Sequence, residues 1–280
     1  MAVVATMSDQ MRAVLRKAAA LAPSPNGIAA DIMAERDAFI AERHYWNEGG
    51  PVMAYSRDDV IATPDGNVPV RYHLPTLNDS APTIVYFHGG GFILGNLDTH
   101  DRIMRTLAHE SYATVVGVDY SLLPEADFAM TLRQCTAVVR RLLAGERGVD
   151  PCRIGLAGDA SGAGLALSTC LSLCNDAGPS VIALLLFDGR FDNLTDDMAG
   201  LPPVFIGAAE LDQQGNGSDR LAETLKSCGL EYHYACYPGV LHGFLQYSRH
   251  LDEAGQALRE GGEFFHDMAI RAIPSTLRAA

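Results

Sequence analysis

Residues 158–162 have the pattern of a strand-to-helix turn that could carry a nucleophile, and they read Gly158-Asp159-Ala160-Ser161-Gly162. In a G-x-S-x-G elbow the central residue is exposed on a sharp turn, and a Cβ on either flanking glycine would clash. The two glycines therefore place Ala160 where a nucleophilic serine is expected. The hydroxyl stands one residue later, on Ser161. We expect the backbone N–H of Ser161 to face an oxyanion at the start of the following helix.

A glycine-rich motif, His88-Gly89-Gly90-Gly91, follows the β-rich run at residues 83–87. Three glycines let the backbone turn tightly and present N–H groups to the oxyanion of a tetrahedral intermediate. Each such donor contributes roughly 3–4 kcal/mol to the stabilisation of that intermediate. We expect Gly89 and Gly90 to be the donors. A triple glycine alone could be a simple turn, but together with the elbow it indicates acyl-transfer chemistry.

An acid and a histidine follow two later strand candidates, residues 203–209 and 231–237. Asp212 comes after the first candidate and His242 after the second. This gives the order nucleophile, acid, histidine that one family of serine hydrolases uses. Because parallel strands end at the same edge of a sheet, an acid and a base at neighbouring ends can meet there. By residue type alone, Glu210 is as good an acid as Asp212.

With these motifs, the chain resembles the hormone-sensitive-lipase family of carboxylesterases, and within it the bacterial acetyl esterases. The resemblance spans nearly the whole chain, and its marks are His88–His100, Asp119–Glu125, the Gly158–Gly162 elbow and Leu241–Phe244. It implies an α/β-hydrolase fold with a mostly parallel sheet, helices on both faces and a small N-terminal helical cap. It also implies no cofactor, and hydrolysis of short-chain acyl esters through an acyl-serine.

The resemblance also implies a role for each matched residue. His242 would take the proton of the nucleophile, Asp212 would orient His242, and the N–H groups of Gly89, Gly90 and Ser161 would hold the oxyanion.

Three features depart from the family pattern. The elbow has alanine at the nucleophile position, the residues after Asp212 form a polar run at 213–218, and the connection at 188–201 is short where relatives usually insert part of the cap.

Three hypotheses follow from these departures. In the first, Ser161 acts as a displaced nucleophile. In the second, which residue chemistry favours, the chain is a catalytically disabled relative that binds a small ligand or a protein. In the third, the chain is an altered form of a normal enzyme.

Composition predicts a single domain over residues 1–280, since 48% apolar residues can form a large core. We expect residues 1–48 to form the cap and residues 49–280 the core. A net charge of −13 argues against nucleic acid and anionic membranes as partners and fits a small neutral acyl ester. A protein partner and a homo-oligomer are left open.

The chain has no apolar run near the roughly 20 residues of a membrane span and no secretory leader pattern, so we expect a cytoplasmic protein. Six cysteines without C-x-x-C or zinc-type spacing predict neither disulfides nor a metal site.

Hydrophobic periodicity predicts the elements that must position these residues. Two amphipathic helices, at 8–21 and 28–46, precede a strand pair at 53–61 and 68–74. Apolar strands then alternate with helices, which indicates a mostly parallel sheet covered on both faces. The later helices are expected at residues 101–110, 128–143, 162–174, 218–228 and 252–270.

Overall fold

The computed structural model describes residues 6–22, 31–78, 81–174, 176, 180–191, 198–212 and 217–273. Residues 1–5 lie outside this set, as do most of the polar run after Asp212 (213–216) and the middle of the short connection (192–197).

One sheet of eight strands organises the described residues, with the strand order β1-β2-β4-β3-β5-β6-β7-β8. Strands β1 and β2 form an antiparallel hairpin, β2 pairs antiparallel with β4, and all later pairs are parallel. The strands are β1 (Tyr55–Thr63), β2 (Gly66–Leu74), β3 (Thr83–Phe87), β4 (Thr114–Val118), β5 (Ile154–Asp159), β6 (Leu184–Phe187), β7 (Val204–Leu211) and β8 (Tyr232–Leu241).

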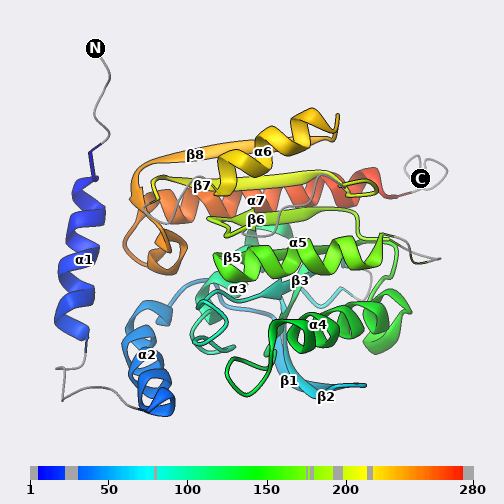
Figure 1. Cartoon of the computed structure of the whole chain (residues 1–280), viewed down its shortest axis with the longest axis horizontal. Coiled ribbons are helices and arrows are strands. Elements are labelled where there is room, and N and C mark those ends of the chain that lie inside the picture. Colours follow the sequence, from blue (N-terminus) through cyan, green and yellow to red (C-terminus); the bar gives the residue numbers. More distant parts are fainter. Residues whose placement is uncertain are drawn as a thin grey trace.

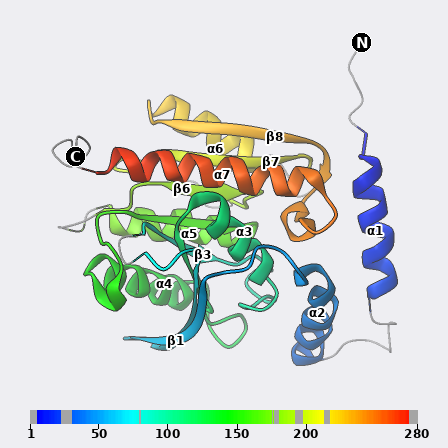
Figure 2. The ribbon, with the colours of Figure 1, turned by 180° about the vertical axis from the view of Figure 1, so that it is seen from behind.

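Helices cover both faces of the sheet, as Figures 1 and 2 show. Helices α4, α5 and α6 lie on the face toward the viewer in Figure 1, and α3 and α7 lie on the face toward the viewer in Figure 2. The helices are α1 (Asp9–Leu21), α2 (Ile32–Asn47), α3 (Asp101–Ser111), α4 (Phe128–Leu143), α5 (Ser161–Leu173), α6 (Gly217–Ser227) and α7 (Asp252–Arg271). Two 3₁₀ turns, Glu146–Gly148 and Phe244–Tyr247, complete the described elements.

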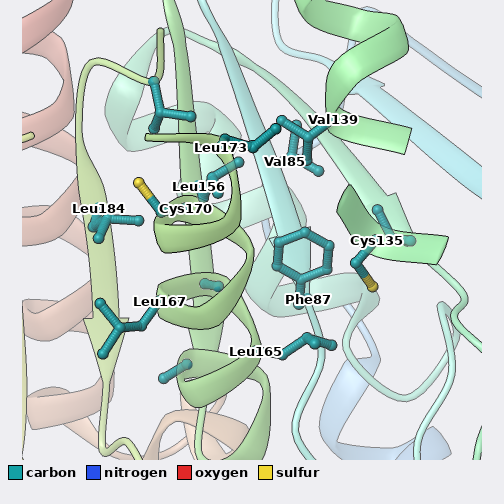
Figure 3. Packing of buried hydrophobic residues seen from close by; sticks show 14 of the residues in the cluster. Val85, Phe87, Cys135, Val139, Leu156, Leu165, Leu167, Cys170, Leu173 and Leu184 are labelled. Atoms are coloured by element: carbon teal, nitrogen blue, oxygen red, sulfur yellow. The ribbon is translucent and has the colours of Figure 1, made fainter. Parts of the chain in front are cut away.

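Each face of the sheet has its own hydrophobic core. On one face, β3 and β5 pack against α4 and α5, and Figure 3 shows Phe87 and Leu156 of the sheet among Cys135, Leu165 and Cys170 of these helices. Strand β3 is buried at all five positions, as expected for a central strand of a parallel sheet. These two cores hold the strands at the centre of the sheet, and therefore their ends, in fixed positions.

Helices α1 and α2 lie at one edge of the molecule (Figures 1 and 2). The side chain of Ser8 caps α1 by accepting a hydrogen bond from the N–H of Met11. The N–H of Ser8 donates to the carbonyl of Gly239 in β8. Trp46 of α2 is fully buried, edge-on to Tyr247. These contacts fix the N-terminal helices on the core.

The sequence predicted these elements closely, with ends displaced by a few residues. The helix expected at 162–174 begins at Ser161, because the elbow turn ends at Ala160. The last strand, expected to end at Tyr237, continues to Leu241 beside β7 with a bulge between Ala209 and Leu211. Among the described residues, no helix is both long and apolar enough to cross a membrane.

The strand topology brings five sequence-distant segments to one edge. Because β3, β5, β6, β7 and β8 are parallel, their carboxyl ends lie at the same edge of the sheet. The residues that follow or close these strands are the glycine motif, Ala160, Asp188, Asp212 and His242.

Candidate active site

The elbow after β5 has the tight geometry that its sequence pattern predicts. Ala160 has φ 49° and ψ −117°, a conformation that costs a non-glycine residue free energy and that occurs at functional turns. A Cβ on Gly158 would lie 2.4 Å from the carbonyl oxygen of Gly162, and one on Gly162 would lie 2.1 Å from that of Phe87. Both glycines are therefore required, and the residue at the apex of the turn is Ala160.

The hydroxyl of Ser161 points toward the glycine motif. Ser161 is buried, and its Oγ accepts a hydrogen bond of 2.9 Å from the N–H of Gly91. The hydroxyl therefore occupies a backbone donor of the loop that was expected to bind an oxyanion. The Ser161 hydroxyl is therefore bonded to the glycine loop and does not stand at the apex of the elbow, which Ala160 occupies.

The expectation that the Gly89 N–H faces an oxyanion does not hold in this structure. The Gly89 N–H donates to Oδ1 of Asp159 at 2.9 Å and is buried. The Gly90 N–H has no acceptor among the described residues, and Gly90 has φ 124°, so a Cβ there would lie 2.1 Å from the carbonyl oxygen of Leu94. Gly90 is thus the glycine whose N–H can meet a ligand at the elbow, whereas the N–H of Gly91 is occupied by the Ser161 hydroxyl. In the sequence, Asp159 could have indicated that the Gly89 N–H is occupied, since a buried carboxylate needs hydrogen-bond donors nearby.

A buried network around Asp159 fixes the loop against the elbow. Besides the N–H of Gly89, Asp159 accepts from the hydroxyl of Tyr86 at 2.6 Å and lies 3.5 Å from Nε2 of His100. Burial acts to raise the pKa of Asp159, but His100, Tyr86 and the Gly89 N–H outweigh it and lower that pKa to about 2. The carboxylate is therefore ionised and holds both motifs in register.

His88 has a structural position in the same loop. Its ring stacks on Tyr120 with centroids 4.3 Å apart, and the hydroxyl of Tyr120 donates to the carbonyl of His88 at 2.6 Å. Burial, and secondly the neighbouring His100, lower the pKa of His88 to about 3, so the ring is neutral. His88 therefore packs and positions the glycines.

His242 meets two carboxylates where the sequence predicted one. Its Nδ1 lies 3.4 Å from Oδ1 of Asp212 and 3.3 Å from Oδ2 of Asp188. Glu210, the alternative acid, instead accepts from the N–H of Gly239 at 2.8 Å. The geometry thus selects Asp212 over Glu210 and adds Asp188. The sequence could have indicated Asp188 only as a single acidic residue directly after the apolar run that forms β6.

The environment of His242 favours its charged form. Burial lowers its pKa, but hydrogen-bonding and charge interactions with Asp188 and Asp212 prevail and raise that pKa to about 10. Burial in turn raises the pKa of Asp188, which is only 1% exposed. Asp188 has φ 50°, and its Oδ2 accepts from the N–H of Gly243 at 2.5 Å. This hydrogen bond holds Asp188 against the loop that carries His242.

The site therefore combines an acyl-transfer scaffold with an alanine at its apex. It has backbone donors for an oxyanion and a histidine oriented by carboxylates, while the apex residue has no nucleophilic atom. Asp188, Asp212 and His242 also form a group whose ligand atoms lie within 4.8 Å of one another, close enough to share a metal ion.

Comparison with known proteins agrees with this scaffold. The family model described as alpha/beta hydrolase fold matches residues 84–196 and 188–246. The chain is 37% identical to the acetyl esterase of Salmonella paratyphi B and 36% identical to that of Salmonella typhi, with 94% of the chain and 95% of each relative covered. These alignments span 311 positions, more than the 280 residues of this chain, so the relatives contain residues that have no counterpart here. The two segments matched by the family model overlap at residues 188–196, in the short connection after β6.

Solved structures show the same likeness. A hyperthermophilic esterase from the archaeon Pyrobaculum calidifontis superposes with a TM-score of 0.85 at 25% identity, covering 95% of this chain and 99% of that one. A thermophilic carboxylesterase cloned from a metagenomic library gives a TM-score of 0.80 at 24% identity, covering 87% of this chain and 99% of that one. The chain therefore belongs to the hormone-sensitive-lipase-like family of α/β hydrolases.

Proposed function

We propose that the chain is a carboxylic ester hydrolase of the acetyl-esterase type, directed at short-chain acyl esters, and that its turnover is slow because Ala160 stands at the nucleophile position. The observation that carries the proposal is the strained elbow at Ala160, beside backbone N–H donors and at the same sheet edge as His242. The acetyl esterases that align with nearly the whole chain support the substrate class.

Without a serine hydroxyl at the apex, an acyl-enzyme on residue 160 cannot form. The remaining machinery can still assist direct attack by water. The N–H groups of Gly90 and Ser161 would stabilise the oxyanion. Nε2 of His242 is the nitrogen that could accept the proton of an attacking water, since Nδ1 faces the carboxylates, and it would do so in the neutral form of the ring, which the raised pKa of about 10 makes a minor form at neutral pH. Removing a triad member leaves about 10³–10⁴-fold catalysis over water in serine hydrolases, so we expect weak hydrolysis of this order.

Helices α1 and α2 would act as a cap beside the substrate. Arg36 of α2 donates hydrogen bonds to the carbonyls of Ile93 and Leu123 at 2.9 and 2.7 Å. It also forms a bidentate ion pair with the carboxylate of Glu125 at 2.7 and 2.8 Å. These contacts join α2 to the segments that follow the glycine motif and β4. The substrate would therefore be a small neutral ester, in keeping with the acidic chain and with a cytoplasmic setting.

A second candidate is a ligand- or protein-binding role without turnover. The specific observation in its favour is the Ser161 hydroxyl, which accepts from the Gly91 N–H and so competes with an oxyanion for that donor. Under this alternative, acyl compounds would bind at the elbow and be released unchanged.

The test is the kinetics of Ala160→Ser with p-nitrophenyl acetate. Loss of a triad serine costs on the order of a million-fold in kcat, so restoring it should raise kcat at least 10³-fold. Ala160→Gly, which also fits the turn but has no hydroxyl, is the matched control and should remain as slow as the natural chain. Wild-type activity already equal to that of Ala160→Ser, and abolished by Ser161→Ala, would overturn the proposal in favour of a displaced nucleophile. An inactive but folded Ala160→Ser that still binds esters would favour the binding role.

A further inference from the structure

The guanidinium of Arg36 joins helix α2 to two loops of the core. Its Nε donates to the carbonyl of Ile93, which follows the glycine motif after β3, and its Nη2 donates to the carbonyl of Leu123, which follows β4. The side chain of Arg36 is only 14% exposed. A single side chain of the N-terminal helices therefore contacts both loops from a largely buried position.

The two loops are also bonded to each other. The N–H of Leu123 donates to the carbonyl of Phe92 at 2.8 Å, and Phe92 precedes Ile93 in the chain. The contacts of Arg36 and Leu123 thus close a ring of hydrogen bonds around residues 92–93. Phe92 has φ 65°, a left-handed conformation that costs a non-glycine residue free energy and that surrounding contacts must hold in place.

The loop that Arg36 contacts carries the oxyanion donor. The carbonyl of Gly90 accepts from the N–H groups of Ile93 at 3.2 Å and Leu94 at 2.9 Å, so residues 90–94 form one hydrogen-bonded turn. The position of Ile93 therefore influences the direction of the Gly90 N–H. An oxyanion donor must lie about 2.7–3.1 Å from the oxygen it binds, and a displacement of about 1 Å can lower a rate about 100-fold.

We propose that Arg36 is a positioning residue that holds the Gly90 N–H in place for the oxyanion. Helix α2 would then support the reaction as well as lie beside the substrate. Arg36 acts through Ile93 and Leu123 and is given no contact with the substrate. The inference rests on the proposed function, because it assigns a role in binding the oxyanion of an ester.

Arginine suits this role because of its shape. Its planar guanidinium presents several N–H donors in fixed directions, whereas the ammonium of lysine is a single compact charge. Glu125 binds the same guanidinium through both carboxylate oxygens, but its side chain is 52% exposed. Exposed ion pairs contribute little on their own, so we assign the positioning to the two carbonyl contacts.

The sequence contains no motif for this contact. Arg36 lies 57 positions from Ile93 and 87 from Leu123. It binds backbone carbonyls, which every residue has, so the residue types at 93 and 123 do not mark the interaction.

The first experiment measures kcat and KM of Arg36→Gln for p-nitrophenyl acetate in the Ala160→Ser background. We expect kcat to fall about 10- to 100-fold with little change in KM, because the oxyanion forms only in the transition state. Glu125→Gln leaves both carbonyl contacts and should lower kcat about threefold or less. Arg140→Gln is the matched control, because Arg140 also binds both oxygens of one carboxylate, that of Asp176, at 2.7 and 3.2 Å. Its kinetics should be unchanged.

The second experiment measures backbone hydrogen exchange in the natural chain, which needs no turnover. Arg36→Gln should speed exchange at the amides of residues 90–94 about tenfold, and Arg140→Gln should not. Arg36→Lys takes the place of Arg36→Gln in both experiments if the latter does not fold, because it keeps the charge and lacks the fork.

Two results would overturn the positioning role. One is a raised KM with unchanged kcat in Arg36→Gln, which would show that Arg36 only helps to bind the substrate. The other is unchanged exchange at residues 90–94. An inactive Ala160→Ser would instead contradict the proposed function, and the exchange measurement would then decide by itself whether Arg36 holds the loop.

Discussion

The two halves of the candidate site differ in how completely their atoms are satisfied. On the elbow side, Asp159 has two hydrogen-bond donors and a nearby imidazole, and each elbow glycine fills a space that a Cβ could not enter. On the histidine side, two carboxylates face one nitrogen, and buried atoms of Asp188 and His242 lack aligned partners. The elbow half therefore keeps its backbone geometry despite the missing nucleophile. The histidine half contains one acid more than a triad needs.

The chemistry requires both a tight backbone at the elbow and paired side chains around His242, and the two halves show that these requirements are independent. The backbone of the elbow depends on glycines and on a buried carboxylate, so replacing the apex serine removes the reaction and leaves the fold intact. The histidine half depends on side chains from three loops, two of which include segments outside the described residues, at 192–197 and 213–216. Changes of the side chains of Asp188, Asp212 or His242 would alter charge and pairing without altering the sheet.

The largest effect is expected from removing both carboxylates in the Ala160→Ser background. Asp188→Asn and Asp212→Asn should each lower kcat by about tenfold or less, because the other carboxylate still faces Nδ1. The double variant should lower it about 10⁴-fold, as loss of the triad aspartate does elsewhere.

The kinetics of these variants with p-nitrophenyl acetate also test whether the extra acid is functional. If Asp212→Asn alone gave the full 10⁴-fold loss, Asp188 would not support the histidine, and the comparison drawn above would fail. Circular dichroism of each variant controls for folding.

A smaller effect, on stability, is expected from Asp159→Asn. The carboxylate is fully buried with Tyr86, Gly89 and His100, and breaking such a network by changing one partner costs about 3–5 kcal/mol in the free energy of unfolding. Urea unfolding at pH 7 measures the loss. Asp98→Asn is the matched control, because Asp98 pairs with Arg71 at the surface and its side chain is 68% exposed, so its change should cost at most about 1 kcal/mol. Equal losses in the two variants would show that the buried network does not hold the elbow.

The same carboxylate predicts a pH dependence of stability. The folded-state pKa of Asp159, about 2, lies below the ordinary value of 3.8. Its stabilisation is therefore fully present above pH 4 and is lost as the pH falls through 2, amounting to about 2 kcal/mol. Wild type should lose this stability between pH 4 and pH 2 and Asp159→Asn should not, as followed by urea unfolding at each pH. Parallel losses in both proteins would contradict the assignment.

The smallest effect is expected from Ser161→Ala in the Ala160→Ser background, a change that gives the Ser-Ala order typical of the family. It removes the hydroxyl that accepts from the Gly91 N–H and leaves that donor available to an oxyanion. We expect kcat to rise on the order of tenfold, below the roughly 100-fold value of a whole oxyanion donor, because a neutral hydroxyl competes weakly. Ser161→Thr keeps a hydroxyl and should show no gain. An unchanged kcat in Ser161→Ala would show that Gly91 does not serve the oxyanion.

The sequence predicted the fold well because its signals were local. Apolar runs such as residues 83–87 and the caps and ends of helices such as 128–143 specify elements directly, and their order specifies a parallel sheet. The apex position of Ala160 followed from two glycines whose packing admits no Cβ.

The rest depended on contacts between distant residues. Gly89 was expected to be a free donor, but the carboxylate that takes its N–H lies 70 positions along the chain. Asp188 has no motif around it, and it reaches His242 only because β6 and β8 end at the same edge of one sheet. Side-chain pairing of this kind arises from tertiary packing, which sequence spacing does not encode.

The central claim, that the scaffold is intact around a missing nucleophile, is tested most directly by a fluorophosphonate probe with intact-mass analysis and peptide mapping. An adduct on the chain itself cannot come from a contaminating esterase. We predict no adduct on the natural chain and one adduct per chain, on residue 160, in Ala160→Ser. A stoichiometric adduct on Ser161 of the natural chain would contradict the account, and so would a folded Ala160→Ser that remains unlabelled.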